Sequence, residues 1–175
     1  ATAIGYLPIL SEGEREALLV TVNDTEMAYQ DTVCFNHLFA QRAALSADRI
    51  ALDVMGDTYS YRELSACTNQ IGRHLINLGV GAGEVVGVYL APGHDMIAAL
   101  LGILEAGAVY LPLDPGYPAD RLAFMIEDSG VTTVVTDADS SATLPVGVGR
   151  TVCLTADAAQ IASLEPNPLE LTRSS

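Results

Sequence analysis

The middle of the chain alternates short apolar runs with longer segments in which apolar residues recur at helical spacing. Continuous apolar runs such as EVVGVYL are typical of strands buried on both faces, and glycines and a proline mark where the intervening helices begin or end. The predicted strands are 84–90, 109–113 and 132–137, and the predicted helices are 95–107 and 119–130, with Pro118 in the first turn of the second. Strands that alternate with helices of this length indicate a parallel sheet built from right-handed crossovers.

The first eighty residues show shorter elements with local capping signals. Ser11 precedes Glu14 by three residues, and Ser60 precedes Glu63 in the same way, so each pair predicts a capping box at the start of a helix. The helix after Ser60 carries an apolar stripe and stops at Gly79. The stripe consists of Leu64, Ile71, Leu75 and Leu78, and the remaining predictions are a helix over 35–45 and a hairpin of two strands that flank Gly56-Asp57.

These elements together predict an α/β fold in which helices and a parallel sheet form a three-layer lobe. A strand and helix repeat more weakly over 152–164. The residues after it, 165–175, are polar and broken by prolines, which predicts a flexible tail.

The net charge of the chain excludes one class of binding partner. Eight basic residues, all arginine, stand against 22 acidic ones, which gives a net charge of −14. Binding to nucleic acid calls for a basic surface, so we expect no nucleic-acid partner. Because the sequence contains no lysine, it supplies neither a phosphate-loop lysine nor a Schiff-base lysine.

Several features indicate a cytoplasmic protein without a membrane partner. The longest apolar stretch, 96–104, falls well short of the roughly 20 residues that span a bilayer, and the N-terminus does not have the pattern of a secretory signal. Cys34, Cys67 and Cys153 are far apart and do not form a CxxC pair, so they are interpreted as reduced thiols. The three histidines are equally scattered, and we assign no metal site.

A glycine-rich stretch at 79–83, GVGAG, invites a dinucleotide-binding interpretation. That interpretation requires the glycines to follow a strand and open a helix, whereas here they follow a helix and precede a strand. A helix C-cap with a tight return is therefore favoured.

Two other turns carry charged residues. His94 and Asp95 follow a predicted strand at the end where parallel sheets bind ligands, although capping of the next helix by Asp95 or a neighbour is the favoured interpretation. Asp114 and Asp120 flank a proline-rich turn with Arg121 within reach of either, but Asp-Pro-Gly and Pro-Ala-Asp are ordinary turn and helix-start chemistry.

Two segments resemble the first two core motifs of the adenylation domains of nonribosomal peptide synthetases, members of the adenylate-forming superfamily. Residues 59–64, YSYREL, depart from the first motif only at their first position. In the second, 104–107 reads LEAG where the family usually has Leu-Lys-Ala-Gly, and 109–115 fits the strand and Asp-Pro that follow. The likeness extends from Leu7 to about Asp137.

The resemblance implies three regions and no chemistry in this chain alone. Residues 1–31 are similar to the linker between a condensation and an adenylation domain, with Val22 where tryptophan is common; 32–164 correspond to part of the adenylation N-terminal subdomain; and 165–175 form the tail. The family's ATP-binding loop and catalytic lysine have no counterpart here, so we carry over no catalytic, cofactor-binding or metal-binding residue. In the complete domain the resemblance implies ATP and Mg, with the remainder of the domain and the condensation and carrier-protein domains as partners.

Two alternatives stay open at this point. One is a noncatalytic scaffold or docking remnant that keeps the adenylation fold within a synthetase assembly. A weaker one is a freestanding nucleotide-binding module, for which ATP binding by the chain alone is the test. The sequence does not name the amino acid activated or the peptide made.

Overall fold

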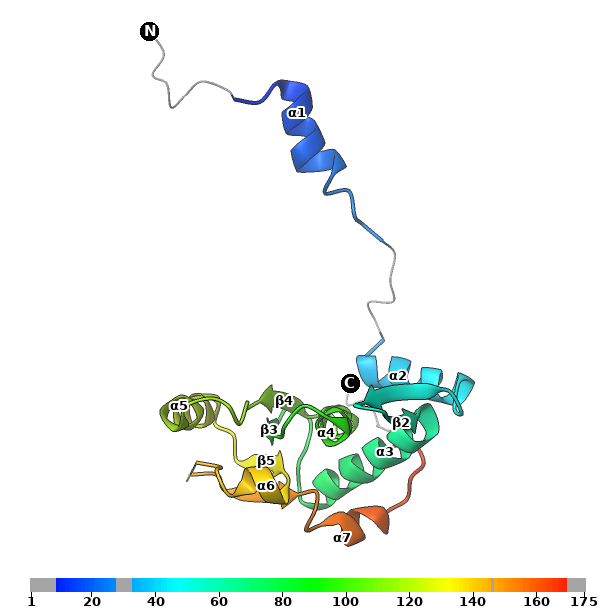
Figure 1. Cartoon of the computed structure of the whole chain (residues 1–175), viewed down its shortest axis with the longest axis vertical. Helices are drawn as coiled ribbons and strands as arrows, with labels where there is room; N and C mark the ends of the chain where they lie inside the picture. The colour runs from blue at the N-terminus through cyan, green and yellow to red at the C-terminus, as the bar shows by residue number, and fades with distance from the viewer. Residues whose placement is uncertain (1–8, 28–32, 146, 170–175) are drawn as a thin grey trace. The chain divides into compact units, whose positions relative to one another are not determined.

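The structure, a computed structural model, describes residues 9–27, 33–145 and 147–169. They belong to two compact units, Ala1–Val33 and Cys34–Ser175 (Figure 1). The first contains α1 (Glu12–Glu16), which continues into a π-helical turn, η2 (Ala17–Thr21). The capping box of Ser11 and Glu14 is present, as predicted, and residues 9–27 are all exposed. The proposed linker's residues 1–8 and 28–31, and the tail's 170–175, lie outside the described residues, so the three-region division stays a prediction.

The second unit contains the remaining elements. Its helices are α2 (Phe35–Leu45), α3 (Tyr61–Asn77), α4 (His94–Glu105), α5 (Ala119–Ser129), α6 (Ala138–Ser141) and α7 (Ala158–Ala162). Its strands are β1 (Ile50–Val54), β2 (Asp57–Ser60), β3 (Val85–Tyr89), β4 (Val109–Pro112), β5 (Thr133–Thr136) and β6 (Arg150–Cys153). The predicted helices and strands are therefore present, and α6, capped by the side chain of Asp137, is an addition. Pro118 is the N-cap of α5 rather than a residue of its first turn.

The antiparallel hairpin of β1 and β2 turns one residue earlier than predicted. Val54 pairs with Asp57, so the two turn residues are Met55 and Gly56 rather than Gly56 and Asp57. Both have positive φ, 53° and 99°, as a type I′ hairpin turn requires. Methionine seldom adopts this conformation, which explains why the sequence pattern misplaced the turn.

The main sheet has four parallel strands in the order β4-β3-β5-β6. The chain moves from β3 outward to β4, then crosses back over β3 to β5. This reversal makes the carboxyl ends of β3 and β5 a topological switch point, the place where open α/β sheets commonly bind ligands.

Alternate residues of the strands face two separate apolar clusters, which confirms the predicted three-layer arrangement. Val86 and Val88 of β3 pack in the cluster that contains α3, α4 and Ile161 of α7. Tyr89 and Val134 pack in the other cluster, with Leu122 and Ile126 of α5. Helices therefore cover both faces of the sheet (Figure 1).

Strand β4 forms one edge of the sheet, and its outer side is poor in hydrogen-bond donors. The amides of Val109 and Leu113 donate inward, to the carbonyls of Glu84 and Val88 at 2.8 and 2.9 Å. Because the direction of backbone groups alternates along a strand, Tyr110 and Pro112 face outward. Proline has no N–H, so Tyr110 carries the one outward amide within β4, which weakens this edge as a template for another strand.

Helices α3 and α4 approach each other closely through two glycines. A Cβ atom added at Gly102 of α4 would lie 2.7 Å from Ile71 Cγ2 and 3.2 Å from the Thr68 carbonyl oxygen, both in α3. A Cβ added at Gly72 of α3 would lie 3.0 Å from the Gly102 carbonyl oxygen. The contact therefore depends on the absence of side chains on both helices.

Glu105, which replaces the lysine of the family's motif, is buried with 6% of its surface exposed. Burial raises the pKa of this carboxyl, and part of the rise is opposed by the charge of His37 and a hydrogen bond from Asn36. Asn36 is itself buried at the start of α2. The carboxyl therefore links α4 to α2 at some cost in desolvation.

We expect Gly102→Ala to lower the free energy of unfolding of the second unit by about 1–3 kcal/mol, even though alanine favours helix by about 1 kcal/mol. The new methyl group must push α3 away from α4. Urea unfolding followed by circular dichroism measures the change. Gly13→Ala is the matched control, since nothing lies within 4 Å of a Cβ added at that helical glycine. An unchanged midpoint for Gly102→Ala would show that the close approach is not required.

We expect Glu105→Gln to stabilise the chain at neutral pH more than at pH 4. The folded carboxyl has a raised pKa, so the folded state holds a proton that the unfolded state has released, and the stability of the native chain falls as pH rises through that window. Glutamine is neutral at both pH values, so the variant does not lose this stability as pH rises. Urea midpoints at pH 4 and 7.5 test the difference, with the exposed Glu127→Gln as control. An equal effect of Glu105→Gln at both pH values would contradict the prediction.

Candidate functional site

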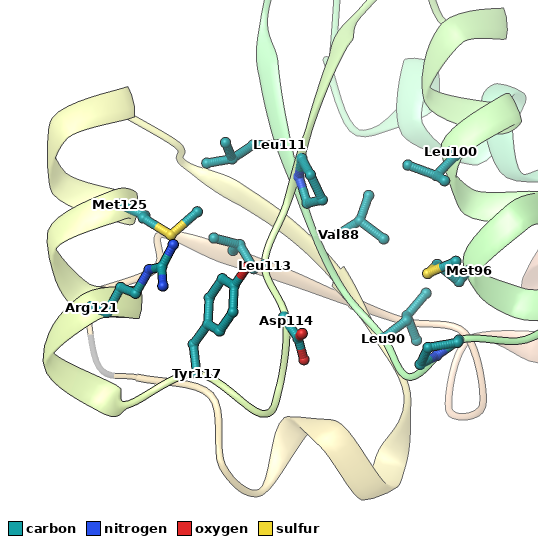
Figure 2. A pocket seen from close by; sticks show the side chains of 12 residues that line it. Val88, Leu90, Met96, Leu100, Leu111, Leu113, Asp114, Tyr117, Arg121 and Met125 are labelled. Atoms are coloured by element: carbon teal, nitrogen blue, oxygen red, sulfur yellow. The ribbon is translucent and has the colours of Figure 1, made fainter.

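A groove of about 420 Å³ lies at the carboxyl ends of β3 and β4, beside the proline-rich turn (Figure 2). Its wall is mostly apolar. The side chains labelled there come from β3 and the residue after it, from α4, from β4 and the turn, and from α5. They are Val88, Leu90, Met96, Leu100, Leu111, Leu113, Asp114, Tyr117, Arg121 and Met125.

The charged residues of this turn stabilise the turn itself. Asp114 Oδ1 accepts a hydrogen bond from the Gly116 amide at 2.8 Å, and the Tyr117 amide donates to the Asp114 carbonyl at 2.9 Å. The Arg121 guanidinium lies 4.0 Å from the centre of the Tyr117 ring, a cation–π contact. Among the described side chains, Asp114, Asp120 and Arg121 form no ion pair with one another. This geometry supports the interpretation of the turn as a structural corner.

A second, larger groove of about 610 Å³ lies on the other side of Leu100. Phe35 and Phe39 of α2, Leu52 of β1 and Tyr110 of β4 contribute to its wall. Phe35 is 63% exposed and Tyr110 is 41% exposed. The sequence did not reveal this groove, because its lining comes from five elements that are spread along the chain, α2, β1, α3, α4 and β4.

His94 and Asp95 lie at the start of α4, but neither caps it. The N-cap is Gly93, a near neighbour of Asp95 that offers no side-chain hydrogen bond, so Asp95 itself does not cap the helix. Instead, His94 Nδ1 lies 2.9 Å from Asp95 Oδ1, and the imidazole stacks on the Tyr59 ring with centroids 4.0 Å apart. Stacking and pairing hold this histidine against the hairpin.

Cys67 lies close to Asp95, in a shallow groove between α3 and α7. Burial, together with the negative charge of Asp95, raises the pKa of its thiol to about 11. A thiol with such a pKa is almost entirely protonated at neutral pH and is a poor nucleophile. The three cysteines are free of disulfide bonds.

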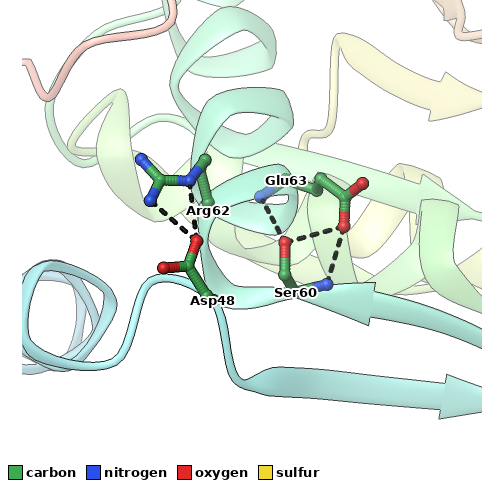
Figure 3. A network of polar contacts seen from close by, with 4 residues as sticks. All are labelled: Asp48, Ser60, Arg62 and Glu63. Carbon is green, nitrogen blue, oxygen red and sulfur yellow. Dashed lines mark hydrogen bonds and ion pairs between the residues drawn. The ribbon is translucent and has the colours of Figure 1, made fainter.

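The first of the two family-like motifs also has a structural role (Figure 3). Glu63 Oε2 accepts hydrogen bonds from the Ser60 amide at 2.8 Å and the Ser60 hydroxyl at 2.7 Å, and the Glu63 amide donates back to Ser60 Oγ at 3.2 Å. These bonds lower the pKa of the Glu63 carboxyl. The exposed pair of Arg62 and Asp48, 2.8 Å apart, ties α3 to the loop before β1. Ser60 and Glu63 thus form the predicted capping box where β2 passes into α3.

The glycine-rich stretch 79–83 lies between the end of α3 and the start of β3, in the order that the sequence predicted. Gly79 and Gly83 have φ values of 91° and 78°. The Val80 amide donates to the Leu75 carbonyl and closes the helix, while the Gly83 amide donates to the Gly107 carbonyl. These glycines therefore have a structural role in the turn between α3 and β3.

The described part of the chain has no cluster of metal ligands. Within it, His, Cys, Asp and Glu side chains do not gather in any group of three or more that could hold a metal ion. In the same residues, none of the helices is long and apolar enough to cross a membrane.

Comparison with known proteins identifies the family. Residues 39–172 match the model of the AMP-binding enzymes. Chondramide synthase cmdD from Chondromyces crocatus is 41% identical over 169 residues, which are 94% of this chain and 4% of that protein. Tyrocidine synthase 3 from Brevibacillus parabrevis is 40% identical over 135 residues, 77% of this chain and 2% of that protein. The chain therefore spans only a few per cent of these relatives.

Solved structures agree with the fold. The crystal structure of the nonribosomal peptide synthetase FmoA3 (S1046A) superposes with a TM-score of 0.80 at 31% identity, over 93% of this chain and 17% of that one. The N-terminal subdomain of Klebsiella oxytoca NpsA superposes with a TM-score of 0.67 at 19% identity, over 79% of this chain and 35% of that one, and supports the fold alone. The chain belongs to the AMP-binding enzyme family and matches the N-terminal part of the adenylation domains of nonribosomal peptide synthetases.

Proposed function

We propose that this chain is the N-terminal framework of an amino-acid-activating domain. The complete domain converts an amino acid and ATP, with Mg, to an aminoacyl adenylate and pyrophosphate, and then loads the thiol of a carrier protein. The observation that carries the proposal is the match of residues 39–172 to the AMP-binding enzymes, together with the similarity to FmoA3.

Within such a domain this chain supplies support for the site rather than reacting groups. The polar residues of its two motif regions, Ser60, Glu63 and Asp114, are engaged in capping and turn formation. The sequence offers no lysine to stabilise charge on a phosphate. We therefore propose that ATP and the amino acid bind to other parts of the domain.

The partners follow from the same argument. The remainder of the adenylation domain covers the exposed apolar surface beside β4, and condensation and carrier-protein domains adjoin it. Cysteines free of disulfide bonds support a reducing location such as the cytoplasm. The noncatalytic scaffold is not favoured, because the similarity runs to synthetases over most of this chain.

We expect amino-acid-dependent exchange between ATP and pyrophosphate only when this chain is mixed with a polypeptide that carries the remaining adenylation motifs. The chain by itself should give no exchange above background. Exchange by the chain alone would show that its own residues perform the chemistry. If the mixture also stays inactive while both parts are folded, the chain is not a working half of such an enzyme.

We expect Phe35→Ser to reduce the exchange reached in that mixture at least tenfold at limiting concentrations, because Phe35 lines the 610 Å³ groove and is 63% exposed. Phe124→Ser is the matched control. That phenylalanine is 65% exposed, but it lies on α5, across the sheet from α4. Titration of each variant with the complementing polypeptide gives the comparison, and equal loss in both variants would argue against the groove as the contact.

A further inference from the structure

The segment that follows α7 runs beside α3 (Figure 1). Together with Ala162, the last residue of α7, its residues 163–168 are called the strap. Three side chains of α3, Asn69, Gln70 and Arg73, donate hydrogen bonds to the strap, and they are called the clamp. Their spacing places them on one side of the helix, since residues three and four apart lie on the same face.

Every bond from the clamp to the strap ends on a main-chain carbonyl, and one further bond, from Asn69 to Ser65 Oγ at 3.5 Å, stays within α3. Asn69 donates to one carbonyl, Gln70 to two and Arg73 to three. The acceptors are Pro166 at 2.8 Å from Asn69; Ala162 and Leu164 at 3.1 and 2.9 Å from Gln70; and Glu165, Asn167 and Pro168 at 2.9, 2.5 and 3.4 Å from Arg73.

The side chains of the strap take little part in this contact. Residues 165–168 are all exposed, whereas Asn69 is buried with 3% of its surface accessible. The Asn167 amide group bonds within the strap itself, to the Glu165 carboxylate at 2.7 Å. Recognition therefore resides in α3 and in the backbone of the strap.

Two further features favour docking of this part of the chain onto α3. Prolines at 166 and 168 restrict the backbone before it docks, which reduces the entropy lost on binding. Beyond the strap, a methyl carbon of Leu169 lies 3.0 Å from where a Cβ of Gly72 would be, so the leucine packs against the bare backbone of α3. Because Arg73 and Gly72 are neighbours in sequence, the polar clamp lies next to the apolar contact of Leu169.

We propose that the clamp is a main-chain recognition surface for an extended, proline-containing polypeptide segment, and that in this chain it holds the strap in place without reading its side chains. The clamp fixes where the chain leaves the lobe after α7. The occupant of the clamp is the strap of this chain, whose main-chain carbonyls accept every bond between the two.

The test is the backbone order of the strap, measured by ¹⁵N relaxation in the full chain at the amides of Glu165, Asn167 and Leu169. We expect order parameters of about 0.85 in the native chain, as in rigid backbone, and below about 0.6 in Gln70→Ala/Arg73→Ala. Arg73→Lys should give intermediate values, because a single ammonium group reaches fewer carbonyls than a guanidinium. Unchanged amide shifts of β3 and β5 verify that the sheet stays folded.

Two control variants separate main-chain recognition from other effects. Arg62→Ala removes an exposed arginine from the same helix and should leave the strap ordered. Glu165→Ala/Asn167→Ala removes the two polar side chains of the strap that bond to each other and should also leave it ordered. Low order parameters in the native chain, or unchanged ones in Gln70→Ala/Arg73→Ala, would overturn the proposal. Equal loosening by the Glu165→Ala/Asn167→Ala variant would show that side chains carry the recognition, and would overturn it as well.

Discussion

The close contact of α3 and α4 through Gly72 and Gly102 is the constraint on which the second unit depends. Helix α4 connects β3 to β4 and covers one face of the sheet, and α3 packs on α4 at backbone distance. The hairpin and α2 then pack against these helices. A side chain at either glycine would separate the helices, and interiors packed at crystal-like density absorb such displacements poorly.

Much of this fold was predictable because its boundaries are set by local chemistry. The Ser60–Glu63 capping box and the glycines that end α3, α4 and α5 act within a few residues of themselves. Features that depend on distant segments were not predictable. Met55 adopts positive φ because the strand pairing requires it, and Glu105 becomes buried where α2 and α3 pack against α4.

The candidate site also combines features that are set by local sequence with features that depend on distant segments. Local turn chemistry predicts a corner at the proline-rich turn, and Asp114 supports the turn through a bond two residues away. The grooves beside β4 escaped sequence reasoning because their walls are assembled from separate elements. The resemblance to adenylation domains came from motifs whose polar residues make capping and turn hydrogen bonds, so the family was recognisable from residues that maintain the fold.

The proline on the outer side of β4 has a consequence for the newly made chain. Strands β3 and β4 leave the ribosome before β5, which at about 5–20 residues per second follows a few seconds later. During that interval the outer edges of both β3 and β4 have no strand partner. The edge of β3 becomes paired when β5 is added. Among the described residues the outer side of β4 pairs with no strand, and Pro112 is in an outward position there. Nascent chains on neighbouring ribosomes therefore find a poor template for aggregation there, although the surrounding apolar surface is still bare.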